Sequence, residues 1–197
     1  MTAIAERGSG DLRRAAARAR LDRRFALSIE VPRRFFREEA DAVSRAALEM
    51  ARRFARGGRL LACGDAAQAS DAEHVAVEFV HPVLVGKRAL PALALTGEVG
   101  RLSSRLAALG RPDDIVLVIV QADLNSAVRS ALAQARELGM LTLALCGDSP
   151  SDHQPGCTEF LFAVPCADPL VVQETHETIY HVFWELVHLF LEHRVTS

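Results

Sequence analysis

Short apolar runs alternate with amphipathic stretches over most of the chain after residue 58. The clearest run, DIVLVIV at 114–120, is continuous and rich in β-branched residues, which is typical of a strand buried on both faces. Strands that alternate with helices indicate a parallel sheet with helices on both faces. We therefore predict an α/β fold, a three-layer sandwich around a five-stranded parallel sheet. The predicted strands are 59–63, 91–97, 114–120, 141–147 and 159–165, and the predicted helices are 71–80, 98–109, 125–140 and 169–193.

The first part of the chain has a different pattern. Residues 1–10 end in Gly-Ser-Gly and predict an irregular start, whereas 11–28 are rich in Arg and Ala and favour a helix. Val31-Pro32 predicts a break before a second helix. The basic helix either binds an acidic partner or is a solvated helix that packs on a neighbouring subunit, and charge runs on helices favour the second interpretation. The predicted organisation is a basic N-terminal arm or helix at 1–32 and an α/β domain at 33–197.

Composition and charge narrow the classes of function. The 197 residues carry a net charge of −2, so no global basic field points to nucleic acid as a partner. We see no secretory signal at the N-terminus and no apolar segment long enough to span a bilayer, so a cytoplasmic protein without membrane partners is expected. The four cysteines form no Cys-x-x-Cys pair and are expected to be free thiols.

Two helices carry polar residues at a spacing that could bind a metal. His74 and Glu78 are four residues apart, which places them on one helix face, and imidazole with carboxylate suits zinc. The pair alone is weak evidence, because such pairs are common as surface contacts. Gln173, Glu177 and His181 form a polar stripe on the last helix. This stripe is either a solvent-facing edge, which the residues alone favour, or the second half of a metal or acid/base site.

Four segments in the right order resemble the phosphoheptose isomerases of the sugar-isomerase (SIS) family. CGDAAQASDAEHVAVEF at 63–79 is similar to the family's Cys-Gly-Asn-Gly-Gly-Ser loop followed by Asp-Ala-x-His-x-Ala-x-Glu. LPALALT at 90–96 and ARELGMLTLALCG at 135–147 resemble the family's later strands. VQETHETIYHVFWELVHLF at 172–190 resembles its Gln-Glu-x-His-x-x-x-x-His ending. The resemblance covers most of 33–193 and implies the SIS, or flavodoxin-like, fold.

The resemblance also implies a site and an activity. The family's zinc ligands correspond to His74, Glu78, Gln173 and His181, one ion per subunit. The implied reaction is the isomerisation of sedoheptulose 7-phosphate through an enediol, with Glu78 as base and His181 as acid. The family is homotetrameric, so a homo-oligomer is expected here, and Glu177 adds a further potential ligand.

The loops expected to bind substrate depart from the family. Where relatives have a Ser/Thr-rich phosphate loop this chain has Val-Gln-Ala-Asp-Leu-Asn at 120–125, in which Asp123 adds negative charge. Asp-Ala-Ala-Gln at 65–68 replaces Asn-Gly-Gly-Ser, so two glycines and their easy positive φ values are lost. The segment 97–114 is also shorter than in the family. Either the enzyme has changed its sugar or sugar-phosphate substrate, or it is a non-catalytic homologue that acts through protein partners. The candidate substrate-binding residues are Asp65, Gln68, Gln121, Asn125 and Ser126.

Overall fold

Five parallel strands form the single sheet of the computed structural model, which describes residues 2–148 and 156–193. The strand order is β2-β1-β3-β4-β5, and every neighbouring pair is parallel. The predicted five-stranded sheet is therefore confirmed, with strand ends within one or two residues of those expected. The strands are β1 (Leu60–Gly64), β2 (Ala92–Thr96), β3 (Ile115–Ile119), β4 (Leu141–Cys146) and β5 (Phe160–Ala163).

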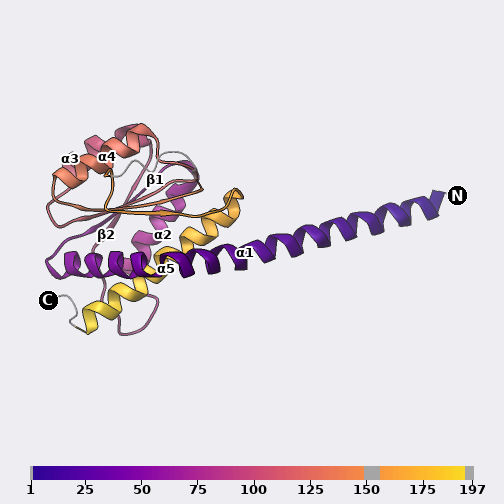
Figure 1. Cartoon of the computed structure of the whole chain (residues 1–197), viewed down its shortest axis with the longest axis horizontal. Coiled ribbons are helices and arrows are strands. Elements are labelled where there is room, and N and C mark those ends of the chain that lie inside the picture. Colours follow the sequence, from indigo (N-terminus) through magenta and orange to yellow (C-terminus); the bar gives the residue numbers. More distant parts are fainter. Residues whose placement is uncertain (1, 149–155, 194–197) are drawn as a thin grey trace.

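Helices cover both faces of the sheet, which confirms the three-layer sandwich (Figure 1). The alternation of side chains along β3 shows why: Ile115, Leu117 and Ile119 enter one apolar cluster, and Val116 and Val118 enter the other. The first cluster includes residues of α1, α2 and α5, and the second includes residues of α3 and α4. The helices are α1 (Thr2–Ala55), α2 (Ala69–Val80), α3 (Leu102–Leu109), α4 (Ser126–Glu137) and α5 (Pro169–Glu192), with short 3-10 turns η1 (Ala66–Gln68) and η2 (Val99–Arg101).

The N-terminal region is one continuous helix, so the predicted break at Val31-Pro32 is wrong, as is the irregular start for residues 2–10. Proline within a helix removes one backbone hydrogen bond and costs about 3 kcal/mol. Burial of Val31 and Phe35 in the core on either side of Pro32 offsets that cost. The division at residues 32 and 33 stays a prediction, although α1 crosses it, and the N-terminal half of α1 extends far beyond the sheet (Figure 1).

The helices α2 and α5 are placed side by side by the strands before them. α2 follows β1 through η1, and α5 follows β5. The indole Nε1 of Trp184 on α5 donates a hydrogen bond of 3.0 Å to the carbonyl oxygen of Glu78 on α2. This contact fixes the two helices at the level where their polar side chains meet. None of the described helices is long and apolar enough to cross a membrane.

Candidate functional site

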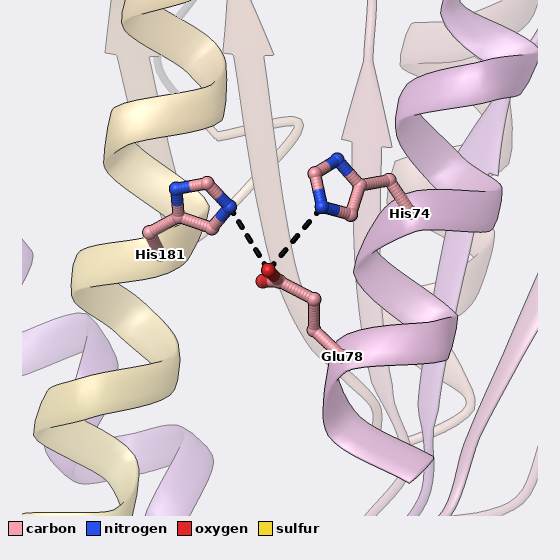
Figure 2. A group of neighbouring side chains, drawn as sticks. All are labelled: His74, Glu78 and His181. Atoms are coloured by element: carbon pink, nitrogen blue, oxygen red, sulfur yellow. Dashed lines mark ion pairs between the residues drawn. The ribbon is translucent and has the colours of Figure 1, made fainter. Parts of the chain in front are cut away.

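His74, Glu78 and His181 meet between α2 and α5 (Figure 2). The Oε1 atom of Glu78 lies 3.2 Å from Nε2 of His74 and 3.0 Å from Nε2 of His181. One potential ligand atom from each of the three residues lies within 4.8 Å of the other two. His74 and Glu78 share one face of α2 because they are four residues apart, and the packing of α5 on α2 adds His181, more than 100 positions away in sequence.

The polar stripe on α5 faces α2, so its members meet the polar residues of the other helix. The amide nitrogen of Gln173 donates to the carboxylate of Asp71 at 3.2 Å, and Glu177 Oε1 lies 3.7 Å from Nδ1 of His74. With the contact of His181 to Glu78, each member of the stripe has a partner on α2. The stripe is partly exposed, yet the interpretation as a mere solvent-facing edge does not account for this pairing.

The donor set of the cluster fits zinc. Two imidazoles and a carboxylate are ligands that zinc prefers, and atoms bound tetrahedrally at 2.0–2.2 Å lie about 3.3 Å apart. The separations of 3.0 and 3.2 Å are near that spacing, and they are also the length of a hydrogen bond between imidazole and carboxylate. Gln173 lies two turns from His181 on the same helix, and its amide is held by Asp71. Since the amide nitrogen faces Asp71, the oxygen is the atom that remains for a metal.

Two site residues were missed from sequence, Asp71 and Tyr180. Asp71 is buried, and this burial raises the pKa of its carboxyl group, an effect that the hydrogen bond from Gln173 opposes. Tyr180 is also buried, and its hydroxyl lies 3.0 Å from Nδ1 of His74. Burial first, and then the charge of Glu177, raises the pKa of Tyr180, so its phenol stays protonated. The signal for Asp71 was its position three residues before His74, on the same helix face.

A cavity of about 490 Å³ opens beside the cluster, and Glu78 and His181 are part of its wall. Its size is within the range of small-molecule sites. The remaining wall combines apolar side chains with charged ones, so the two site residues face a space that could hold a ligand. The other lining residues are Val83, Leu84, Lys87, Trp184, Glu185 and Leu189.

The loops at the carboxyl ends of β1 and β3 are joined by two glutamines. The amide of Gln68 donates to the side-chain oxygen of Gln121 at 2.8 Å, and Gln121 donates to the carbonyl of Pro169 at 3.0 Å. Asn125 caps α4 by accepting from the backbone N–H of Val128. The structure therefore gives Gln68, Gln121 and Asn125 partners within the protein. Asp65 and Ser126 form no side-chain hydrogen bond that is resolved among the described residues, and lie before η1 and at the start of α4.

Two features of these loops differ from what the sequence suggested. The carboxylate of Asp123 is paired with the guanidinium of Arg129, at 3.1 Å from each oxygen, so its negative charge is largely compensated. Ala66 has a φ of 43°, so this loop has a positive φ at a position where the family resemblance gives a glycine. An alanine in this region is strained by about 1–2 kcal/mol.

Two further histidines on α5, His176 and His188, and two cysteines are buried in the core. His176 donates from Nε2 to the carbonyl of Cys146 at 3.1 Å, and His188 is buried between the backbone oxygens of Trp184 and Arg88. All four cysteines are free, and burial raises the pKa of Cys63 and of Cys146 to about 12, which makes these two thiols unreactive.

Comparison with known proteins agrees with this fold. The SIS domain family matches residues 25–147, and the chain belongs to this family. Its relatives include the phosphoheptose isomerase of Desulfovibrio desulfuricans, 36% identical over 176 residues with 83% of each chain covered, and that of Roseiflexus sp., 34% identical with 81% and 87% covered. The solved structure of phosphoheptose isomerase from Neisseria gonorrhoeae has the same fold, with a TM-score of 0.75 at 24% identity over 87% of this chain and 98% of that one.

Proposed function

We propose that the protein is a metal-dependent aldose–ketose isomerase of the sugar-phosphate isomerase class, with a substrate preference that differs from that of its relatives. The observation that carries the proposal is the position of Glu78, which lies between two histidines and in the wall of a cavity. The names of the relatives, phosphoheptose isomerases, support the same class of reaction.

Zinc would be held by His74, Glu78 and His181, which lie together, and by Gln173, the fourth ligand that the family resemblance implies. When bound, zinc supplies a Lewis acid that polarises the carbonyl group of a sugar. The short distances from Glu78 Oε1 to both imidazoles support this ligand set, and the hydrogen bond that the Gln173 amide donates to the Asp71 carboxylate would hold that amide in one orientation.

The chain's own residues account for the proton transfers. The Glu78 carboxylate removes a proton from the hydroxyl-bearing carbon next to the carbonyl group, and the C–H electron pair becomes the C=C bond of an enediol. His181 donates a proton to the former carbonyl oxygen. In the second half, Glu78 returns its proton to the neighbouring carbon, and His181 takes one from the other hydroxyl as the new C=O bond forms. Atoms and charge balance, and both residues return to their starting state.

The loops support a change in substrate. A phosphate cradle needs free hydroxyls and backbone N–H groups, whereas Gln68 and Gln121 are bonded to each other and Asn125 caps a helix. We infer a preference for an unphosphorylated or differently charged polyol, and Asp65, Gln68, Gln121, Asn125 and Ser126 are the loop residues proposed to bind it. The alternative of a non-catalytic homologue is not favoured, because the proposed base Glu78 and acid His181 lie together in the wall of a cavity.

A homo-oligomer, a tetramer as in the family, is part of the proposal. Leu21 and Phe25 on the extended half of α1 are 63% and 66% exposed. Val83 and Val85, in the loop after α2, are also exposed. An isolated helix gains little stability in water without packing of its apolar face, so contact with another subunit would explain this exposure.

The test is a substrate panel on the full chain, stripped by chelator and then reloaded with zinc. Aldose–ketose exchange is followed by NMR in deuterated water, because the enediol route exchanges the proton on carbon. We expect exchange only in the reloaded protein, and with a sugar other than sedoheptulose 7-phosphate as the best substrate. Rapid turnover of sedoheptulose 7-phosphate would contradict the altered substrate preference. If no sugar in the panel showed zinc-dependent exchange, the proposal that the protein is an isomerase would be wrong.

A further inference from the structure

We propose that Tyr180 is a positioning residue that holds the imidazole of His74 in the orientation and tautomer that bind the metal. This rests on the proposed function, because it assigns His74 as a ligand through Nε2. Neither the sequence motif nor the family's ligand set includes position 180.

The geometry singles out the tyrosine hydroxyl as the partner of Nδ1. The hydroxyl lies 3.0 Å from Nδ1, within hydrogen-bond distance. The carboxylate of Glu177 lies 3.7 Å from Nδ1, which is too far for a hydrogen bond. Tyr180 is 1% exposed, so water does not compete for its hydroxyl. Its ring also lies edge-on to both histidines, with centroids 5.4 Å from His74 and 5.0 Å from His181.

The chemistry of the hydroxyl explains why a tyrosine suits this place. An imidazole that binds zinc through Nε2 carries its proton on Nδ1, and this N–H needs an acceptor. Without zinc, Nε2 of His74 can donate to Glu78 Oε1 at 3.2 Å, and Nδ1 then needs a donor. A hydroxyl can both accept and donate, so Tyr180 satisfies His74 in either form. Phenylalanine would keep the packing and lose this function.

Loss of the Tyr180 hydroxyl should lower the affinity for metal more than it lowers the stability of the fold. Removal of a partner that orients a ligand histidine typically weakens metal binding 10–100-fold. The ring of Tyr180 packs in the core formed by α1, α2 and α5, and that contact is retained by phenylalanine. The matched control is Thr175, which is also buried on α5 and whose hydroxyl donates to the carbonyl of Val171, away from the cluster.

The experiment compares wild type, Tyr180→Phe and Thr175→Val as chelator-stripped full-length proteins, titrated with zinc by calorimetry. We expect zinc affinity to fall 10–100-fold in Tyr180→Phe and to stay unchanged in Thr175→Val. In the NMR spectrum of zinc-loaded wild type, the Nδ1–H proton of His74 should be protected from exchange and show a cross-relaxation signal to the Tyr180 ring. In Tyr180→Phe that proton should exchange rapidly.

The outcomes separate the two proposals. Wild type that binds no zinc would overturn the metal-dependent function and the positioning role with it. Wild-type binding with an unchanged affinity in Tyr180→Phe would overturn the role of Tyr180 alone. If the phenylalanine variant does not fold, the wild-type spectrum still decides, since the absence of a protected Nδ1–H proton near the Tyr180 ring would overturn the positioning role.

Discussion

Two regions beside α2 and α5 differ in how their polar residues are held, and we call them the helix end and the loop end. At one end, His74, Glu78 and His181 project from the middle of two helices and meet one another. At the other end, Gln68 and Gln121 lie at the ends of strands and bind each other and the start of α5. The helix end has every residue that the family resemblance required, and the loop end has lost the family's hydroxyls and glycines.

Under the proposed function, this difference means that the chemistry and the substrate recognition are separable in this fold. Side chains on packed helices are held precisely, because moving them would disturb the core between the sheet and the helices. Loops at the ends of parallel strands contribute little to the core and tolerate substitution. A chain can therefore keep the proton-transfer residues while the ligand that they act on changes.

The largest expected effect is at the helix end, on turnover. Glu78→Gln removes the proposed base without changing its size, so turnover should fall about 10²–10⁴-fold with any sugar that the wild type converts. The control is Glu73→Gln on the same helix, whose side chain is exposed, and which should keep wild-type activity. Rate measurements on the best sugar of the panel decide this, and a Glu78→Gln enzyme within a factor of three of wild type would remove Glu78 from the mechanism.

The next effect is on metal affinity at the same end. His181→Ala removes a ligand and should weaken zinc binding at least about 100-fold, since even residues that only orient ligands account for 10–100-fold. His193→Ala is the matched control, because His193 also lies at α5 and is exposed. Calorimetry on chelator-stripped protein makes the measurement. Equal affinity of wild type and His181→Ala would mean that the cluster of His74, Glu78 and His181 is not a metal site.

Much of the fold could be predicted from the sequence, because β-branched runs such as 114–120 are compatible with few structures other than a buried strand. The continuity of α1 could not be predicted, because the cost of Pro32 inside the helix is offset by core contacts of Val31 and Phe35, and these contacts are tertiary. Local spacing likewise placed His74 and Glu78 on one face, but only the packing of α5 on α2 adds Tyr180. The pairing of Asp123 with Arg129 was missed for a similar reason, since a list of charges does not show which of them compensate each other.

A third prediction concerns how the free energy of unfolding depends on pH. The group involved is His176 on α5, which contacts the carbonyl of Cys146 near the loop end. Burial lowers the pKa of His176 to about 4, so the folded protein disfavours its charged form. In the unfolded chain the pKa of this histidine is the ordinary 6.5. The contribution of neutral His176 to the free energy of unfolding is therefore complete above pH 6.5 and is lost as the pH falls from 6.5 to about 4. Between pH 7 and 5 the loss should be about 2 kcal/mol.

Urea unfolding of wild type and His176→Gln at both pH values provides the measurement. Glutamine can still donate to the carbonyl of Cys146 and does not titrate, so the wild type should lose about 2 kcal/mol more than the variant on acidification. Equal losses in the two proteins would show that His176 is not held neutral in the folded state.

The smallest expected effect is at the loop end, where Ala66 has a φ of 43°. Glycine adopts this conformation without steric cost, and the relief of about 1–2 kcal/mol is partly offset by the greater entropy of glycine in the unfolded chain. Ala66→Gly should therefore stabilise the protein by about 0.5–1 kcal/mol in urea unfolding and leave zinc affinity unchanged. Ala67→Gly, one residue along in η1 and without a positive φ, should instead destabilise it by a similar amount. If both variants were destabilised, Ala66 would not be strained in the folded protein.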